Sequence, residues 1–147
     1  MRWWASDERA ILRTFEALLE SVAKAGEETE LERFAKTRQF CAHFATTFVV
    51  SAHPYEGTIS DRQGLAAVLD GYRSSVAMVS ASAAARELSL RGNGTADLFA
   101  TINLDSSGGR GAGRERFRIR IAWLREESGW KIREAEILER LESSGLF

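Results

Sequence analysis

Two carboxylates near the C-terminus, Glu134 and Glu136, are the side chains that the sequence places best for acid–base chemistry. They continue the alternation of Trp130 and Ile132, which puts them on the apolar face of a strand, because strand side chains point to opposite faces in turn. A carboxylate in an apolar cavity has a raised pKa and can act as a general acid or base. A bulge or the end of the sheet would instead return both glutamates to solvent, and a neighbouring arginine would neutralise one of them.

The apolar face itself is predicted from alternation in three segments. From residue 116 to 121 arginines alternate with apolar side chains, and Trp123 continues the apolar face. The pattern restarts at Gly129 after a short turn. Residues 95–104 alternate in the same way, so the three segments predict antiparallel strands with one apolar face. We expect this face to line a pocket for a small apolar ligand, formed by Leu98, Ala100, Ile102, Phe117, Ile119, Ile121, Trp123, Trp130 and Ile132.

The other residues able to carry chemistry predict neither a metal site nor a covalent site. Cys41 and His43 are two residues apart on a predicted helix, so their side chains point away from each other, and His53 falls in a later turn. This spacing argues against a three-ligand metal site and against a cysteine–histidine nucleophile pair. The glycine-rich run 108–113 lacks the lysine and hydroxyl residue of a phosphate-binding loop, which indicates a flexible hairpin tip. We therefore predict no metal and no cofactor.

A row of three arginines occupies the opposite face of the strand: Arg116, Arg118 and Arg120. The expected neighbours on the next strand are Lys131 and Arg133, and like charges side by side on a sheet repel each other. Glu87 and Asp97, from the preceding strands, would compensate them and give a solvated face of mixed charge. Otherwise the row meets an acidic partner or a second subunit.

The overall composition is that of an ordinary globular domain. The chain has 147 residues, the size of one domain, and its 44% apolar and 28% charged residues are typical. The net charge of −1 gives no general attraction to nucleic acid, and Phe99 alone is available on the basic face for base stacking. We expect one domain over residues 1–147 that binds no nucleic acid.

The N-terminus carries two tryptophans, Trp3 and Trp4, shortly before Ser6, which is a predicted helix N-cap. They either pack against the body of the domain or are the remnant of a removed membrane anchor, since tryptophans concentrate at membrane interfaces. No apolar run approaches the ~20 residues needed to cross a bilayer, and no signal-peptide pattern is present. The chain is soluble as given, and the anchor interpretation would make it the extracytoplasmic domain of an anchored or exported protein.

Three helices with apolar faces at helical spacing are predicted in the N-terminal half. The first begins after Ser6 and ends near Ala25. The second opens with a capping box at residues 29–32 and continues to about Phe44. The third opens with a capping box at residues 60–63, and its inner side carries Leu65, Val68, Leu69 and Tyr72.

The remaining elements are predicted to be strands. A strand over 46–50 is followed by a turn at 53–57, with a returning edge strand over 55–59. Residues 76–90, rich in alanine and serine, predict a long, bent or bulged strand, and Asn93-Gly94 suits a tight turn after it. Two helices, a short hairpin, a helix and a four-stranded meander indicate an α+β fold with the helices on one face of a curved sheet.

This element order, the strand–turn–helix segment from Phe48 to Tyr72 and the closing strand at Trp130-Lys-Ile132 resemble the nuclear transport factor 2-like superfamily. That superfamily includes ketosteroid isomerases and polyketide-cyclase-like proteins. The resemblance implies a cone around a pocket, with three helices from the N-terminal half packed on a curved, mainly antiparallel sheet. Residues 6–11 and 44–50 are similar to bacterial members, some of which carry an N-terminal membrane segment or signal, and this supports the anchor interpretation.

The resemblance also sets expectations for function. An isomerase of this class needs a catalytic carboxylate together with hydroxyl or acid donors to an oxyanion. Neither Tyr55 nor Tyr72 lies in a motif that matches those positions. We therefore expect a non-catalytic module that binds a small apolar ligand or acts as a scaffold, and that forms a homodimer through its sheet. The alternative is a small-molecule isomerase, cyclase or hydrolase that uses Glu134 or Glu136.

Overall fold

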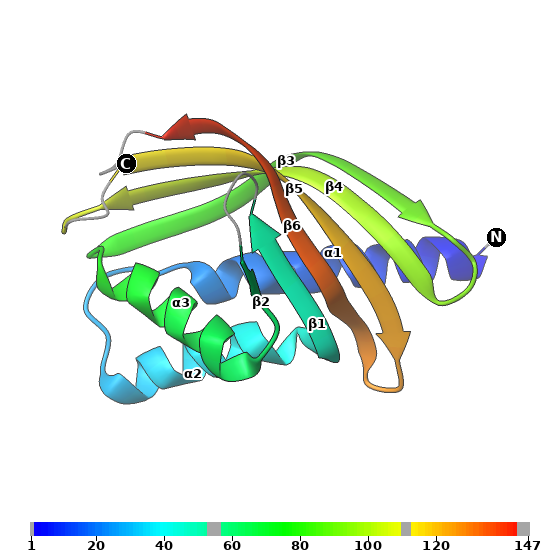
Figure 1. Cartoon of the computed structure of the whole chain (residues 1–147), viewed down its shortest axis with the longest axis horizontal. Coiled ribbons are helices and arrows are strands. Elements are labelled where there is room, and N and C mark those ends of the chain that lie inside the picture. The colour runs from blue at the N-terminus through cyan, green and yellow to red at the C-terminus, as the bar shows by residue number, and fades with distance from the viewer. Residues whose placement is uncertain (1, 53–56, 110–112, 144–147) are drawn as a thin grey trace.

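Three helices pack on one side of a curved, six-stranded sheet in the computed structural model of the chain (Figure 1). The structure describes residues 2–52, 57–109 and 113–143, and within these ranges it describes the side chains of residues 6–142. The helices are α1 (Arg2–Val22), α2 (Glu30–Ala42) and α3 (Arg62–Ser74). The strands are β1 (Phe44–Ala52), β2 (Thr58–Ile59), β3 (Met78–Leu90), β4 (Thr95–Ser107), β5 (Gly113–Glu126) and β6 (Gly129–Ser143). The predicted α+β class and element order are confirmed.

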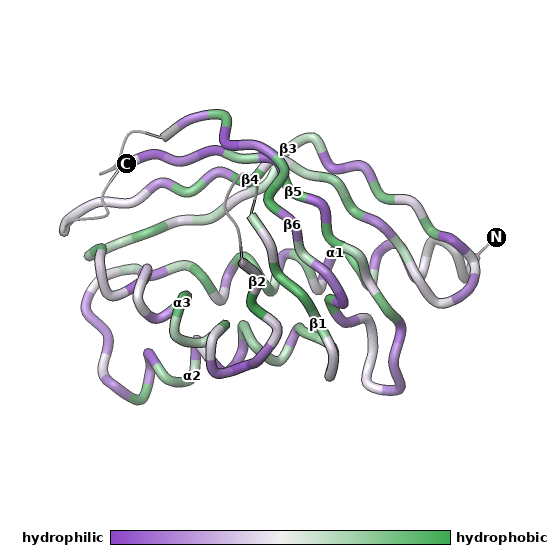
Figure 2. Tube along the Cα trace, viewed as in Figure 1, coloured by the Kyte–Doolittle hydropathy of each residue, from purple (hydrophilic) through white to green (hydrophobic). Residues whose placement is uncertain are grey.

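The strands are arranged in the order β2-β1-β6-β5-β4-β3. All neighbours are antiparallel except β1 and β6, which run parallel because the chain crosses over through α3 and the β3–β5 meander between them. Helix α1 runs along the concave side of the sheet, and α2 and α3 lie beside it (Figure 1). Hydrophobic and hydrophilic positions alternate along the strands (Figure 2), so the concave face is apolar and the outer face is polar.

Helix α1 begins and ends earlier than predicted. It starts at Arg2, so Ser6 lies inside the helix and not at its N-cap, and Trp3 and Trp4 are in its first turn. It ends at Val22, because Lys24 leaves the helix to exchange two backbone hydrogen bonds of 2.9 Å with Val79 on β3. Within the described residues, no helix is both long and apolar enough to cross a membrane.

The N-termini of α2 and α3 are capped in different ways. The capping box predicted for α2 is confirmed, with reciprocal bonds between Thr29 and Glu32. Helix α3 is capped by Asp61 and not by Ser60, since the Asp61 carboxylate accepts a 3.1 Å hydrogen bond from the Gly64 backbone. An aspartate is as good an N-cap as a serine, and here the backbone of Asp61 has the extended conformation that a cap requires.

The apolar residues at the start of α2 are exposed. Leu31 is 77% exposed and Phe34 is 61% exposed, and α2 contains no fully buried residue. On α3, Leu65 and Leu69 are buried as predicted, but Val68 is 58% exposed at the edge of the helix. Helix α2 therefore packs on the outside of α1 and α3, and only its C-terminal end, with Phe40 and Cys41, packs against the core.

The predicted bend in β3 is confirmed. Its pairing with β4 shifts between Ala84 and Glu87, and Ala85 has a positive φ of 52° within this bulge. Few non-glycine residues adopt such a φ, so the bulge has a strained backbone. The bulge carries the side chain of Arg86 towards α1, where its guanidinium pairs with Glu16 and lies 5.4 Å from the centre of the Phe15 ring.

Strand β6 also contains bulges, and they decide which of its side chains face the helices. Ile132 pairs with Trp123, but the next pair is Glu134 with Ala122, so β6 has one residue more than β5 at Arg133. Because the side-chain period of a strand is two, one extra residue moves every following side chain to the other face. Two further register shifts follow along β6. Ile119 pairs with Ile137 but Arg118 pairs with Glu139, and Phe117 pairs with Arg140 but Arg116 pairs with Glu142, so β6 has one extra residue at each point.

Candidate ligand-binding cavity

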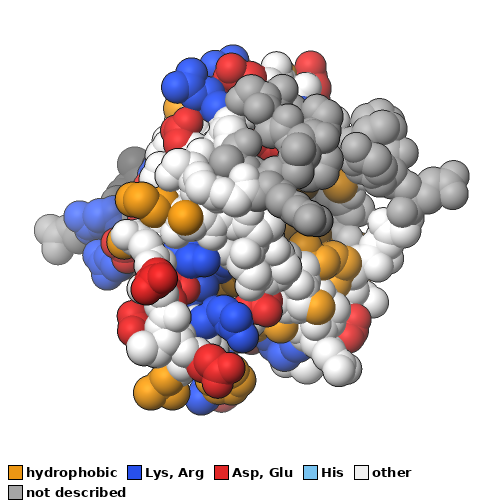
Figure 3. Space-filling model, turned by 90° about the vertical axis from the view of Figure 1, so that its left-hand side faces the viewer, with side chains coloured by type: hydrophobic (Ala, Val, Ile, Leu, Met, Phe, Trp, Pro, Cys, Tyr) orange, Lys and Arg blue, Asp and Glu red, His pale blue; other side chains and the backbone are white. Residues whose placement is uncertain are grey.

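An apolar cavity of about 290 Å³ lies between the helices and the concave face of the sheet. The helices contribute Phe15, Leu18, Leu19, Val22, Phe40, Leu65, Val68, Leu69 and Tyr72 to its wall. The strands contribute Val50, Ile59, Ala81, Ile102, Leu104, Phe117 and Ile119. Tyr72 is the one lining residue with a polar side-chain group among those that the structure describes. Figure 3 views the molecule from the left-hand side of Figure 1, where hydrophobic side chains reach the surface among charged ones.

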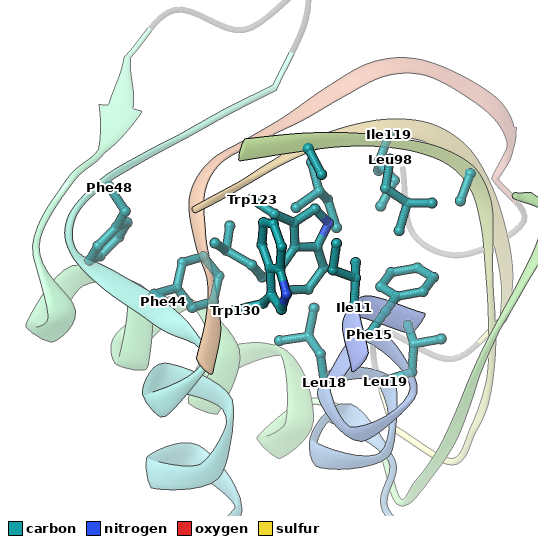
Figure 4. Close-up of a cluster of buried hydrophobic side chains, with 14 of the residues drawn as sticks. Ile11, Phe15, Leu18, Leu19, Phe44, Phe48, Leu98, Ile119, Trp123 and Trp130 are labelled. Carbon is teal, nitrogen blue, oxygen red and sulfur yellow. The ribbon is translucent and has the colours of Figure 1, made fainter. Parts of the chain in front are cut away.

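The cavity occupies only part of the predicted pocket. Ile102, Phe117 and Ile119 line it as expected. The other predicted pocket residues fill the hydrophobic core instead: Leu98, Ala100, Ile121, Trp123, Trp130 and Ile132. The reason is α1, whose side chains Ile11 and Phe15 enter the space in front of the two tryptophans (Figure 4). The cone is thus solid at the end near the two tryptophans and open at the other.

Glu134 and Glu136 do not border the cavity, and the expectation that they would is wrong. The bulge at Arg133 places Glu134 opposite Ala122 and Glu136 opposite Arg120, on the outer face of the sheet. The Arg120 side chain donates hydrogen bonds to Glu134 at 2.7 Å and to Glu136 at 3.2 Å. The two carboxylates are 40% and 35% exposed, so they are solvated counterions of an arginine. Ala135 and Ile137 take their place against the core.

The outer face is therefore a ladder of opposite charges. Arg116, Arg118 and Arg120 of β5 stand opposite Glu142, Glu139 and Glu136 of β6. The predicted neighbours Lys131 and Arg133 are not beside the arginine row, because the bulges of β6 bring glutamates there. The predicted compensation from Asp97 is present in part, since its carboxylate lies 3.5 Å from Arg120. Cross-strand pairs of opposite charge stabilise a sheet modestly.

Three polar side chains gather where the cavity meets the open end of the sheet: Tyr72, Ser106 and Glu115. Tyr72 lies in the last turns of α3 and lines the cavity, and its hydroxyl is hydrogen-bonded to Ser106 on β4. Glu115 stands opposite Leu104 and two residues before Phe117, both of which line the cavity, so it shares their face. We refer to these three residues as the mouth cluster.

The environment of the mouth cluster keeps the Tyr72 phenol protonated. Burial raises the pKa of Tyr72, and the negative charges of Glu115 and Asp105 raise it further, while the Ser106 hydrogen bond opposes this effect. Asp105 is on the outer face, where its carboxylate accepts a 3.0 Å hydrogen bond from Arg114. The cavity mouth thus offers a hydroxyl that burial and the charges of Glu115 and Asp105 keep in its neutral form.

Two glycines hold the β4 end of the mouth cluster in place. Gly108 and Gly109 have φ values of 70° and 94° and pack directly on the segment that follows α3. A Cβ on Gly109 would lie 2.3 Å from the Ser75 carbonyl oxygen, so glycine is required there. The backbone of Ala77 donates hydrogen bonds to Ser107 and Gly108 at 2.9 and 2.8 Å. This part of the glycine-rich run is packed, in contrast to the predicted flexible tip; residues 110–112 are outside the described part.

A buried arginine holds the α3 end of the cluster. Arg73, next to Tyr72, is 1% exposed, and its guanidinium donates to the carbonyl oxygens of Val22 and Ala23 at the end of α1. It also pairs with Glu28 at 2.8 Å. Lys24 donates in turn to the carbonyl oxygens of Arg73 and Val76, both at 2.9 Å. A cation at the C-terminus of α1 complements the helix dipole, so this network joins α1 firmly to α3.

The cysteine and histidine residues form no site in the described part of the chain. Cys41 is half-buried on α2, and burial raises the pKa of its thiol, which disfavours the nucleophilic thiolate. His43 is the C-cap of α2, and burial together with the charge of Lys131 lowers its pKa. Within residues 2–52, 57–109 and 113–143, no three metal-binding side chains cluster. His53 and Tyr55 fall outside the described residues.

The sequence contained a signal for the mouth cluster that the prediction did not use. Glu115 has the same strand parity as Phe117, so the alternation that identified the pocket face also includes this carboxylate. Tyr72 was predicted on the inner side of its helix, and that placement is confirmed. Their proximity could not be predicted, because it depends on how α3 packs across the end of the meander.

Comparisons with known proteins support the fold. No protein-family profile matches the chain, and no curated protein matches it in sequence. Among solved structures, it is similar to a candidate scytalone dehydratase from Novosphingobium aromaticivorans, with a TM-score of 0.78 and 12% identity over 97% of this chain and 89% of the other. It is also similar to a nuclear transport factor 2-like protein with a cystatin-like fold from the same organism, with a TM-score of 0.73 and 12% identity over 96% and 86%.

A third structure gives the same result. A candidate dehydratase of the nuclear transport factor 2-like family from Streptomyces avermitilis has a TM-score of 0.70 and 14% identity over 90% of this chain and 95% of the other. Identities this low establish shape and connectivity, and the activities named for these proteins are theirs. With three helices on a curved, mostly antiparallel sheet of matching topology, the chain has the nuclear transport factor 2-like, cystatin-like fold.

Proposed function

We propose that the protein binds a small apolar molecule in the cavity between α1, α3 and the sheet, without transforming it. The observation that carries this proposal is the lining: apart from Tyr72, every lining residue that the structure describes has an apolar side chain. A filled scaffold would leave no such cavity. The volume of about 290 Å³ is just below the ~300–1,000 Å³ common for small-molecule sites, which favours a ligand of one or two rings.

The position of the polar groups defines how such a ligand would lie. Its apolar body would contact residues such as Phe15 and Ile119 deep in the cavity, where removing apolar surface from water contributes ~25 cal/mol per Å². A single hydroxyl or carbonyl group would reach the mouth cluster and share a hydrogen bond with Tyr72. In this arrangement the single polar contact orients the ligand, and the burial of its apolar surface provides most of the binding free energy.

A second candidate function is a small-molecule enzyme of the isomerase, cyclase or hydrolase type. The observation in its favour is the mouth cluster, where a carboxylate, Glu115, acts on the pKa of a neighbouring hydroxyl, Tyr72. Glu115 would take the role first predicted for Glu134 or Glu136. The named dehydratases among the structural neighbours add weight to this candidate, at identities of 12 and 14%. Against it, all the polar groups that we describe lie at the mouth, and the deep wall is apolar.

Direct binding tests the first proposal. Isothermal titration with 2-acetonaphthone and 2-naphthol should give saturable binding, and ligand at ~100 times its Kd should stabilise the fold by ~2.7 kcal/mol. Ala81→Phe, which fills the cavity from β3, should abolish binding. Ser82→Phe, one residue further on and exposed on the outer face, is the matched control and should bind normally. Binding that survives in Ala81→Phe would place the ligand elsewhere and overturn the proposal.

Product analysis separates the two candidates. The same ketone and a panel of steroid-like ketones are incubated with the protein and followed by chromatography. Binding without any product supports the non-catalytic role. Turnover that disappears in Glu115→Gln and Tyr72→Phe would establish the enzyme instead.

We also propose that two copies associate through the outer face of the sheet. The arginine row of β5 lies beside the glutamate row of β6, so a two-fold axis would set the arginines of one copy against the glutamates of the other. Sedimentation velocity should show a dimer. Arg118→Glu should dissociate it, whereas Arg33→Glu on α2 should not. A monomer at all accessible concentrations would overturn this proposal.

A further inference from the structure

The turn between β3 and β4 contains the dipeptide Asn93-Gly94, which lies outside the ligand cavity. The backbone of Arg91 donates a 3.1 Å hydrogen bond to the Thr95 carbonyl oxygen, and the backbone of Arg125 donates a 2.8 Å hydrogen bond to the Gly94 carbonyl oxygen. Asn93 is exposed, and Gly94 follows it with a positive φ of 80°. The sheet thus holds the turn in place and leaves the Asn93 side chain in solvent.

The side-chain amide of Asn93 is hydrogen-bonded in a way that favours attack on its carbon. The Thr95 hydroxyl donates a 2.5 Å hydrogen bond to Asn93 Oδ1. This bond draws electrons away from Cγ, and it stabilises the negative charge that forms on Oδ1 when a nucleophile adds to Cγ. Thr95 is the first residue of β4 and pairs with Leu124 of β5, so the sheet fixes the position of the hydroxyl.

A nucleophile lies directly beside this amide: the backbone nitrogen of Gly94. Within the described residues, no group accepts a hydrogen bond from the Gly94 N–H. A Cβ on Gly94 would meet no atom within 4 Å beyond its chain neighbours, so the space around it is open. Glycine has no side chain to obstruct a ring between its nitrogen and Asn93 Cγ. A reaction between adjacent residues also avoids the entropy cost of bringing two molecules together.

We propose that Asn93 is a site of self-modification, at which the Gly94 nitrogen converts the asparagine to aspartate and isoaspartate with the help of the Thr95 hydroxyl. The nitrogen bonds to Asn93 Cγ, and the bond from Cγ to Nδ2 breaks. The proton that the Gly94 nitrogen gives up leaves with Nδ2 as ammonia. Water then opens the cyclic imide at either of its two carbonyl groups. One opening gives aspartate, and the other gives isoaspartate, in which the side-chain methylene becomes part of the main chain.

The reaction changes both the charge and the length of the turn. Each product adds a negative charge beside a surface depression that Gly94 and Thr95 line together with Asp7 and Arg125, which pair at 3.3 Å. Isoaspartate also adds a backbone atom to the short connection between β3 and β4. The hairpin is therefore altered permanently without a second protein.

The test follows Asn93 by peptide mass spectrometry while the folded protein is incubated at mildly alkaline pH, with Asn103 as internal control. These are the only asparagines of the chain, and cleavage after arginine leaves both on one peptide, residues 92–110. Asn103 pairs with Ser82 and Arg116 inside the sheet, so its extended backbone cannot close the same ring. Asn93 should convert at least about tenfold faster than Asn103 and give both products. An intact Asn93, equal conversion of the two residues, or aspartate without isoaspartate would overturn the proposal.

Two variants test the role of the Thr95 hydroxyl. Thr95→Ser keeps the hydroxyl and should convert at nearly the wild-type rate. Thr95→Val keeps the shape of the side chain without the hydroxyl and should slow the conversion of Asn93 several-fold. In urea, which unfolds the chain and removes the contact, this difference should disappear. Equal rates in the two folded variants, or the same difference in the unfolded chain, would overturn the role of Thr95.

Discussion

The Arg120 side chain donates a 2.7 Å hydrogen bond to Glu134 across the outer face of the sheet. This contact exists because of the bulge at Arg133, which turns Glu134 and Glu136 away from the helices. The hydrogen bonds and charges of both glutamates raise the pKa of Arg120, although partial burial opposes the effect. Two residues that the alternation pattern nominates as pocket acids are thus the counterions of an arginine on the opposite side.

Removing these carboxylates should therefore leave ligand binding unchanged. Glu134→Gln and Glu136→Gln should bind 2-acetonaphthone as the wild type does and should lose only ~0–1 kcal/mol of unfolding free energy, as exposed ion pairs do. Titration calorimetry and urea denaturation measure the two quantities. A large loss of affinity in either variant would show that the outer face communicates with the cavity.

The two faces of β5 should differ strongly in their contribution to stability. Trp123 is 0% exposed in the core, and Trp123→Ala should cost roughly 3–5 kcal/mol of unfolding free energy. Trp123→Phe should cost less, because no acceptor within the described residues bonds the indole N–H and no hydrogen bond is lost with it. Arg118→Ala on the outer face should cost less than ~1 kcal/mol. Urea denaturation in which Arg118→Ala is the most damaging of the three would contradict the face assignment.

The Arg73–Glu28 pair should be a major stabilising contact between α3 and the segment that joins α1 to α2. Glu28→Gln leaves the buried guanidinium without its counterion, and removing one partner of a buried pair costs ~3–5 kcal/mol. The exposed pair of Arg33 and Asp70 offers the comparison, and Asp70→Asn should cost ~0–1 kcal/mol. Thermal and urea melts of both variants decide the point. Equal, small effects would mean that water reaches Arg73.

Close packing of the β4 end against the segment after α3 can be tested with two glycines that differ in surroundings. Gly94 has a φ of 80° with open space around it, so Gly94→Ala should cost only backbone strain, ~1–3 kcal/mol. Gly109→Ala adds a clash with the Ser75 carbonyl oxygen to a similar strain and should cost distinctly more. Similar costs for both variants in chemical denaturation would show that this contact is loose.

Tyr72 should titrate above the ordinary tyrosine pKa of ~10. Burial and the nearby carboxylates favour the protonated phenol in the folded state. An unfolded chain therefore loses this proton first as pH rises, so the Tyr72 contribution to stability is present below the unfolded pKa and declines above it. Phenolate absorbance in a Tyr55→Phe background isolates Tyr72, because the chain has only two tyrosines. Glu115→Gln should lower this pKa; an unchanged value would mean that Glu115 is too distant to act on the mouth.

The sequence alone determined the elements and most of their faces. Strict alternation from Phe117 to Trp123 identified a half-buried strand, because a period of two puts like residues on one face whatever the strand packs against. The capping box of Thr29 and Glu32 is equally local, since its bonds join residues three apart. From such patterns the α+β order, the buried tryptophans and three cavity residues, Ile102, Phe117 and Ile119, were predictable.

The tertiary structure decided where the cavity lies and which carboxylate borders it. The bulge at Arg133 is a mismatch between two strands, so it is fixed by the pairing of β6 with β5. In the sequence it shows only as a change of phase, from Trp130 and Ile132 to Ala135 and Ile137, which the alternation of Trp130 and Ile132 alone does not predict. The exposure of Leu31 and Phe34 depends on α2 packing outside the other helices. Tyr72 and Glu115 are more than forty residues apart in the sequence, and only the packing of α3 against the open end of the sheet brings them to one site.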